Sequence, residues 1–195
     1  MKQFFPHEKL DVYIYSLKWA EMARELTDSW PSTMAVSDQL DRATESIVTK
    51  LAKAARLRGT DRGIYLRECS LGSVLECAAC MDVANRRQLA DSPSCREAKL
   101  LLQRIARMEV GLRKSWVGSV KEDSESYGAD SQDYFLYESI DLYRRSLEVH
   151  DILSPLWMST AKRIRILTRV DQLSTTLTTN IAEGNGRFSQ LDHNR

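Results

Sequence analysis

The chain has 195 residues, of which 43% are apolar and 28% are charged, and its 28 basic and 27 acidic residues give a net charge of +1. The apolar fraction excludes wholesale disorder, and the near-neutral charge excludes a strongly basic nucleic-acid coat protein or an acidic solvating tail. Only 8 glycines and 4 prolines are present, which disfavours turn-rich all-β folds. We therefore expect an all-α fold with short connections.

Four helices are predicted within residues 1–117, at about 6–29, 33–57, 61–89 and 93–117. Each carries apolar residues at three- and four-residue steps, which is typical of an amphipathic helix. These stripes are Val12, Tyr15, Trp19, Met22 and Leu26; Val36, Leu40, Ala43, Ile47, Leu51 and Ala54; Leu71, Leu75, Ala78 and Met81; and Ala98, Leu101, Ile105, Met108 and Leu112. Four such helices with short loops predict an antiparallel up-and-down four-helix bundle.

Residues that favour helix ends stand between these four segments. They are Pro31 at the end of the first helix, Ser32 or Thr33 as the cap of the second, Gly59 as a left-handed stop, Thr60 or Asp61 as the cap of the third, and Ser92 followed by Pro93 at the start of the fourth. Residues 118–133 then hold one basic and five acidic residues, a net charge of −4, and are predicted to form an acidic linker.

The sequence pattern begins again after the linker, with a constant shift of 130 residues. The matched residues are Phe135, Glu138, Asp141, Tyr143, Ser146 and Leu147, which repeat Phe5, Glu8, Asp11, Tyr13, Ser16 and Leu17. We interpret residues 134–195 as the first half of a second bundle repeat, a helical hairpin with helices at about 133–154 and 160–183. The run of residues 174–179 is rich in β-branched threonine, yet it is predicted to be helical because its stripe overlays that of the second helix.

The predicted hairpin exposes apolar stripes that two helices cannot bury alone. Its stripe residues are Tyr143, Leu147, Ile166, Val170, Leu173, Leu177 and Ile181. We expect a homo-oligomer through residues 134–183, with a two-fold dimer favoured over a ring. The alternative is that the hairpin packs against the first bundle of its own chain.

Two motifs resemble those of a known family. Residues 180–187 read Asn-Ile-Ala-Glu-Gly-Asn-Gly-Arg, preceded by Ile140-Asp141-Leu142-Tyr143, and a Gly-Ser-x-x-Glu stretch lies at 72–76. Both resemble the 23S rRNA intervening-sequence proteins, a four-helix bundle family that includes the accessory variability determinant of diversity-generating retroelements. The motif residues carried over are Asn180, Glu183, Gly184, Gly186, Arg187, Gly72, Ser73 and Glu76. The first copy departs from the motif, with Lys53 and Ala54 where the second has Glu183 and Gly184.

The resemblance carries functional implications of its own. It implies an all-α bundle that assembles into rings, often pentamers, without enzymatic activity. For the retroelement members it implies binding of nucleic acid and of a reverse transcriptase.

Asn180, Glu183 and Arg187 are candidates for a polar interaction site, because Asn180 and Glu183 share a helix face. The alternative interpretation is a helix terminus, with Gly184 in a left-handed cap and Ser189 starting the next helix. Cys77 and Cys80 form a Cys-x-x-Cys pair without a nearby histidine and in the middle of a helix, so we expect core residues and no metal or other cofactor.

Six cations cluster around the second loop and could contact phosphates, or they could complement a helix dipole. They are Lys50, Lys53, Arg56, Arg58, Arg62 and Arg67. A second basic group comprises Lys162, Arg163, Arg165 and Arg169.

No catalytic constellation is evident, because the acidic pairs Asp38–Asp41 and Glu21–Glu25 lack histidine, serine or glycine-rich partners and suit a solvated face. We expect a non-enzymatic assembly protein that oligomerises and presents a binding surface to a nucleic acid or protein. The alternative is a nucleic-acid-binding accessory factor of the retroelement type. A start without an apolar signal stretch, four cysteines and no membrane span predict a cytoplasmic location without membrane attachment.

Overall fold

The computed structural model describes residues 5–117, 135–159 and 165–191, and every regular element in those ranges is helical. The elements are the 3₁₀ turn η1 (Pro6–Lys9), α1 (Asp11–Thr27), α2 (Ala35–Arg56), α3 (Asp61–Arg86), α4 (Ser92–Val117), the 3₁₀ turn η2 (Leu136–Ser139), α5 (Asp141–Ser159) and α6 (Arg165–Leu191). The predicted all-α class with six helices is confirmed. The predicted linker, residues 118–133, lies outside the described residues.

Four features of the predicted helix boundaries need correction. Both predicted first helices of the two copies are divided, because Leu10 and Ile140 adopt extended backbone between a 3₁₀ turn and the α-helix. Helix α5 continues past Pro155 to Ser159 instead of ending at 154. Helix α6 runs to Leu191, through the Ser-Thr run at 174–179 and through Gly184, so the predicted left-handed cap at Gly184 is wrong.

The capping residues predicted from local sequence are found at some helix ends but not at others. Gly59 has φ +78°, and the Thr60 side chain accepts a 3.1 Å hydrogen bond from the Gly63 backbone N–H. At α4 the cap is Asp91 in place of Ser92, since Asp91 Oδ1 accepts from the Ser94 N–H at 2.8 Å. Helix α2 begins after Met34, whose own side chain supplies no cap.

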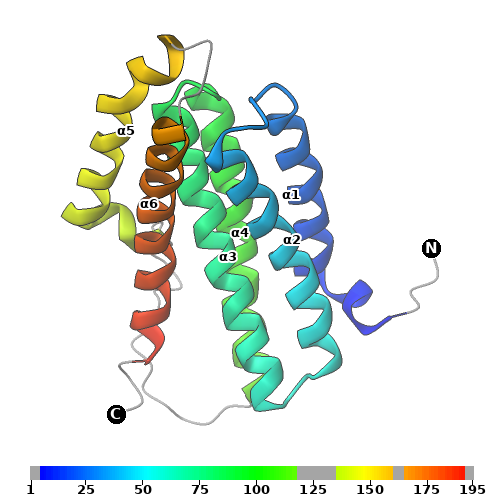
Figure 1. The fold of residues 1–195 in the computed structure, drawn as a ribbon. Coiled ribbons are helices and arrows are strands. Elements are labelled where there is room, and N and C mark those ends of the chain that lie inside the picture. Colours follow the sequence, from blue (N-terminus) through cyan, green and yellow to red (C-terminus); the bar gives the residue numbers. More distant parts are fainter. Residues whose placement is uncertain (1–4, 118–134, 160–164, 192–195) are drawn as a thin grey trace.

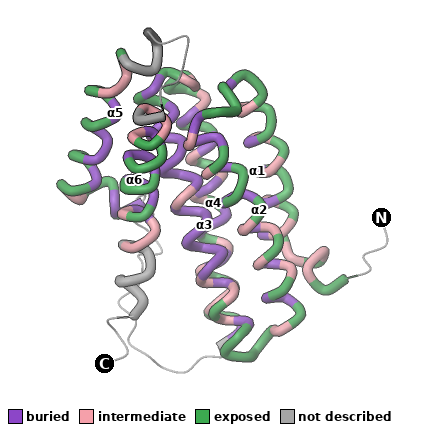
Figure 2. The backbone as a smooth tube through the Cα atoms, in the orientation of Figure 1, coloured by how far each residue is buried: buried purple, intermediate pink, exposed green. Residues whose placement is uncertain are grey.

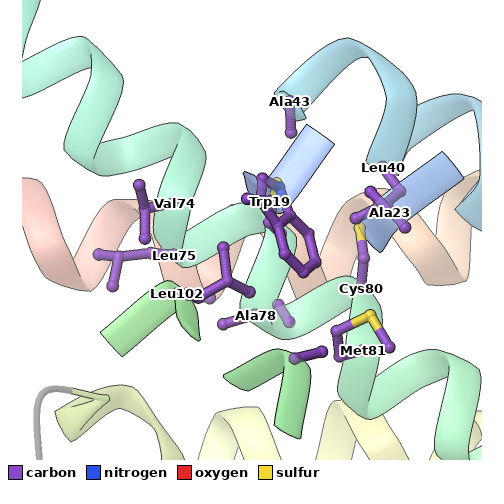
Figure 3. Packing of buried hydrophobic residues seen from close by; sticks show 14 of the residues in the cluster. Trp19, Ala23, Leu40, Ala43, Val74, Leu75, Ala78, Cys80, Met81 and Leu102 are labelled. Carbon is purple, nitrogen blue, oxygen red and sulfur yellow. The ribbon is translucent and has the colours of Figure 1, made fainter. Parts of the chain in front are cut away.

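Helices α1 to α4 lie side by side, joined by short connections at their ends (Figure 1). Every apolar residue predicted for the α2 stripe, such as Leu40 and Ile47, is at most 2% exposed. Trp19 fills the space between α1, α2 and α3, near Leu40, Ala78 and Leu102 (Figure 3), and its indole N–H donates to Thr44 Oγ1 at 3.0 Å. This core is the one that apolar periodicity predicts.

Helix α3 lies between two sets of helices, with α2 and α4 on one side and α5 and α6 on the other. Its tube is buried along most of its length (Figure 2). Buried residues occur all round the helix, well beyond the predicted stripe, and many are small, including Gly72, Ser73, Cys77, Ala79, Cys80 and Ala84. Small side chains let neighbouring backbones approach closely, so α3 can be the centre of both layers.

The hairpin of α5 and α6 packs on α3 of the same chain, mainly through α6 (Figure 1). This is the arrangement that the sequence left as the alternative to pairing between chains. The turn η2 and helices α5 and α6 begin 130 residues after η1, α1 and α2, which is the offset of the sequence repeat.

Candidate functional site

The hairpin is attached to the bundle by a buried polar cluster around Arg87, the residue that follows α3. The Arg87 guanidinium donates to His150 Nδ1 at 3.0–3.1 Å, to Ser174 Oγ at 3.3 Å and to Thr175 Oγ1 at 3.2 Å, and it forms an ion pair with Asp171. The side chains of Arg87 and Asp171 are each 1% exposed. We call these five residues the Arg87 cluster.

Asp171 also caps the N-terminus of another helix, α2. Its Oδ2 atom accepts a 2.9 Å hydrogen bond from the backbone N–H of Ala35, the first residue of α2. A carboxylate at a helix N-terminus satisfies a free N–H and complements the helix dipole. The cap that local sequence assigned to Ser32 or Thr33 is therefore supplied by α6, 136 residues further along the chain.

His150 is buried within this cluster and is held neutral. Its Nδ1 accepts from Arg87, so the Nε2–H is free to donate to Thr178 Oγ1, 3.2 Å away. Burial lowers the His150 pKa, the Arg87 charge lowers it further, and the resulting pKa is about 3. Nothing in the sequence connects this histidine with Arg87, because 63 residues separate them.

A second polar contact joins the hairpin to α3 and α4. Asp82 accepts from the Tyr143 hydroxyl at 2.7 Å and from Lys99 at 2.6 Å, while Glu138 accepts from Lys99 at 2.6 Å. Burial opposes the charge on Lys99, but the two carboxylates outweigh it and raise the Lys99 pKa. An open groove of about 800 Å³ lies beside this contact, lined by Lys99, Asn85, Arg96 and Phe135 among others.

Five large apolar side chains of the hairpin are exposed. Leu142 and Ile152 of α5 are 60% and 75% exposed, and Leu173 and Leu177 of α6 are 55% and 48% exposed. Val149 is exposed as well. We call these five residues the outer apolar face; they lie on the sides of α5 and α6 that point away from the buried Tyr143, His150, Asp171 and Thr178.

The predicted stripe of α6 is therefore wrong about which face packs. Leu173 and Leu177 are exposed and Val170 and Ile181 are half-buried, whereas the polar residues Asp171, Ser174, Thr175, Thr178 and Thr179 are buried. The buried hydroxyls bond to Arg87, to His150 or to backbone carbonyls of α6 itself, which removes most of the cost of burying them. On α5, the predicted Tyr143 and Leu147 are buried.

Among the residues carried over from the family motifs, the structure brings Glu76 of α3 near Glu183 of α6. Ser73 Oγ shares a 2.8 Å hydrogen bond with Ser46 Oγ, and Glu76 accepts from the Gln39 amide. Burial raises the Glu76 pKa, and the nearby Glu183 carboxylate raises it further. Asn180 is exposed, Gly72 is buried, and the side chains of residues 186 and 187 lie outside the described part of the chain.

The predicted basic cluster divides into an exposed part and a buried residue. Lys53, Arg56, Arg58 and Arg62 are exposed around the α2–α3 connection, and we call these four the basic turn; Lys50 is half-buried. Arg67 is not part of that surface, because it is completely buried. In the second basic group, Arg169 is exposed, whereas Lys162 and Arg163 and the side chain of Arg165 lie outside the described residues.

Arg67 instead forms a buried group with Glu109 of α4. It donates to the Glu109 backbone carbonyl at 3.2 Å, and the Glu109 carboxyl accepts from Ser70 Oγ at 2.8 Å. Burial raises the Glu109 pKa to about 8, against the opposing effects of Arg67 and Ser70. Ionisation of the Glu109 carboxyl inside the bundle core therefore costs free energy.

All four cysteines are free and buried, which confirms the core interpretation of Cys77 and Cys80. Burial raises the Cys77 pKa to about 12, so its thiol is a poor nucleophile. Within residues 5–117, 135–159 and 165–191, no three His, Cys, Asp or Glu side chains are grouped so that they could hold a metal ion. The acidic residues Glu21, Glu25, Asp38 and Asp41 are exposed, as expected for a solvated face.

Helices, interior polar contacts and exposed faces together define an all-α helical-bundle protein. No described helix is long and apolar enough to cross a membrane. A family model described as 23S rRNA-intervening sequence protein matches residues 8–111, and the chain belongs to that family. The match spans α1 to α4, so the second, partial copy remains our prediction. Neither curated proteins nor solved structures gave a match.

Proposed function

We propose that this family member is a non-enzymatic helical assembly protein that self-associates and presents a charged surface to a partner. The observation that supports the proposal is the outer apolar face. Five large apolar side chains between 36% and 75% exposed lie on a single helical hairpin. Exposed apolar side chains that gather on one element favour an interaction site, whereas scattered ones need no explanation.

The interior of the protein supports a structural role for its titratable groups. Arg87, His150 and Asp171 are buried and bonded to one another, and the cysteines are buried in the apolar core. Each of these groups serves packing or attachment of the hairpin. The proposal includes a cytoplasmic location, which the unpaired cysteines support because reducing compartments keep thiols free.

The mass of the full chain in solution tests self-association. We expect sedimentation velocity to give a mass above 22.3 kDa at micromolar concentration and a shift toward the monomer on dilution. A single 22.3 kDa species at every concentration up to 100 times that range would contradict the proposal.

A second candidate function is contact with the phosphates of a nucleic acid through the basic turn. Its four cations are exposed at one end of the bundle, and the only acidic residue between Lys53 and Arg62 is Asp61. Phosphate contacts make affinity fall with salt, by a slope of about 0.7–0.9 per contact in log–log form. The four exposed cations would give a slope of about 3.

A gel-shift titration over a salt series tests this candidate. Replacing Lys53, Arg56, Arg58 and Arg62 by glutamine should abolish the salt-dependent binding. The matched control replaces Arg144 and Arg145, which are exposed on α5 away from the basic turn, and should leave the binding unchanged. Equal losses in both variants would mean that binding follows overall charge, and this candidate would be rejected.

A further inference from the structure

The buried group around Arg67 and Glu109 contains polar atoms that its own contacts leave unpaired. Both side chains are completely buried, yet Arg67 Nε and Glu109 Oε2 have no hydrogen-bond partner among the described residues. Arg67 donates instead to the Glu109 backbone carbonyl at 3.2 Å, and Ser70 donates to the other oxygen of the carboxyl at 2.8 Å. Native proteins rarely leave a buried polar atom without a partner, so these two atoms need an explanation.

Arg113 of α4 adds a third unpaired atom to the same group. Glu68 Oε1 lies 3.5 Å from Arg67 Nη2 and 3.6 Å from Arg113 Nε, so the two guanidinium groups are neighbours around one oxygen. The Arg113 Nε atom is buried as well and has no described acceptor within hydrogen-bond distance. Arg113 follows Glu109 by one helical turn on α4, so their side chains share the face that meets Arg67 of α3.

The charges of this group do not balance at neutral pH. Burial raises the Glu109 pKa to about 8, so the carboxyl is protonated and its unpaired oxygen becomes a donor. Two arginines then face one carboxylate, that of Glu68, which leaves an excess of positive charge. Burial lowers the Arg67 pKa, and the Arg113 charge lowers it further against the opposing effect of Glu68, as expected where cations outnumber carboxylates.

We infer that Arg67, Glu109 and Arg113 together bind one small monovalent anion, of the size and charge of chloride. An anion accepts hydrogen bonds and donates none, so one ion pairs with all three donors and neutralises the excess charge. A water molecule suits the group less well, because it brings two hydrogens of its own to atoms that are all donors. The Arg113 side chain is 40% exposed, which gives the ion a path from solvent.

A bound anion would join α3 to α4, because two of its donors come from α4 and one from α3. These donors lie near the start of α3 and the end of α4, the end of the bundle that also carries the α2–α3 connection (Figure 1). A ligand that binds only the folded state raises the free energy of unfolding as its concentration increases. The site therefore predicts specific stabilisation of the bundle by chloride, whatever the oligomeric state of the chain.

Thermal unfolding of the full chain in chloride tests the site. Chloride is raised from about 1 to 300 mM at pH 6.5, and sodium gluconate, a much larger anion, keeps the ionic strength constant. Once the site is mostly filled, we expect the melting temperature to rise by about 3–5 °C for each tenfold increase in chloride. A melting temperature that does not change over this range would overturn the inference and assign the unpaired atoms to water.

Arg113→Gln removes one donor and one charge at a partly exposed position, so this variant should still fold. It should need at least ten times more chloride than the wild type for the same stabilisation. The matched control is Arg96→Gln, which removes the same charge from an exposed position of α4 outside the group and should keep the wild-type response. Equal weakening in both variants would mean that chloride acts through overall charge, and the site would be rejected.

Glu109→Gln tests whether the carboxyl proton belongs to the site. The charged groups that face this carboxyl are Arg67 and Glu68 of α3 and Arg113 of α4. The glutamine amide offers an N–H donor at every pH, whereas the wild-type carboxyl loses its proton above about pH 8. Chloride should therefore stabilise the wild type at pH 6.5 but not at pH 9.5, and stabilise the variant at both. Loss of the chloride effect at pH 9.5 in the variant as well would contradict donation from Glu109 to the ion.

Discussion

The α1–α4 bundle and the α5–α6 hairpin differ in how much of their packing is polar. The bundle has an apolar core in which Trp19, Leu40 and Ile47 are fully buried. The hairpin adds Tyr143, Leu147 and Ala182 to that core, but it also meets α3 through charged and hydroxyl groups centred on Arg87. An apolar core is tolerant of small changes in geometry, but a buried ion pair is stable only while every partner is present. The hairpin should therefore depend on a few residues, and the bundle on many.

The largest effect that separates the two regions is expected for Arg87→Met. Removing Arg87 leaves Asp171 buried without its partner, which costs about 3–5 kcal/mol. Because Asp171 and His150 belong to the hairpin, hydrogen exchange should show loss of protection in α5 and α6 with little change in α1 and α4. The double variant Arg87→Met, Asp171→Leu should recover part of the loss. Equal loss of protection throughout the chain would mean that hairpin and bundle unfold together.

A matched pair of substitutions compares the two copies directly. Ile47 and Leu177 occupy the same position in the 130-residue repeat, but Ile47 is fully buried and Leu177 is 48% exposed. Ile47→Ala should lower the free energy of unfolding by about 2–5 kcal/mol. Leu177→Ala should change it by less than about 0.5 kcal/mol in the monomer. Denaturant titrations at low protein concentration measure both, and similar losses in the two variants would contradict the different burial of these two positions.

The bundle should lose stability as the pH rises. The pKa of Glu109 is raised to about 8 in the folded chain, above the ordinary value of 4.5, because the carboxyl is buried. The free energy of unfolding that protonated Glu109 contributes is fully present below pH 4.5. It is lost between pH 4.5 and 8, by at most about 1.4 kcal/mol per pH unit. Glu109→Gln should flatten this dependence in denaturant titrations. A variant with the wild-type pH profile would show that Glu109 is not the titrating group.

The hairpin should respond to pH in the opposite direction. The pKa of His150 is lowered to about 3, so the folded chain keeps it neutral, whereas the unfolded hairpin takes up a proton below pH 6.5. The free energy that neutral His150 contributes to attachment of the hairpin is fully present above pH 6.5. It is lost as the pH falls toward 3, by at most about 1.4 kcal/mol per pH unit. Hydrogen exchange of α6 between pH 7 and 5 measures the loss. His150→Gln should make this pH-dependent loss of protection smaller. The same loss in the variant as in the wild type would show that a group other than His150 titrates.

The sequence predicts the bundle better than the hairpin, and the reason is physical. The stripe of α2 and the turn at Gly59 and Thr60 depend on local periodicity and backbone geometry, which a sequence displays directly. The face of α6 that packs depends on Arg87, which lies 84 residues before Asp171. When a helix has one apolar face and one hydroxyl-rich face, periodicity alone predicts that the apolar face is buried. Only the position of Arg87 in the fold shows that the hydroxyl-rich face is buried instead.

Two further errors have the same origin. The charged neighbours of Arg67 in the sequence predict an exposed cation, but Glu109 and Ser70 lie around it inside the bundle. Local sequence predicts the cap of α2 among adjacent residues, whereas Asp171 supplies it from another helix. The density of serine and threonine at 174–179 was the one available signal, since a helix that carries so many hydroxyls against its propensity can be burying a polar face.

Thiol labelling of single cysteine variants tests the central claim, that α6 packs through its hydroxyl-rich face and leaves Leu173 and Leu177 outside. Leu177→Cys and Thr178→Cys change adjacent residues of α6, which are 48% and 0% exposed, and the four native cysteines are buried and should react slowly. In monomeric protein at low concentration and pH 7.5, we predict that Cys at position 177 reacts at least ten times faster than Cys at position 178. Faster reaction at position 178 would contradict this packing of α6.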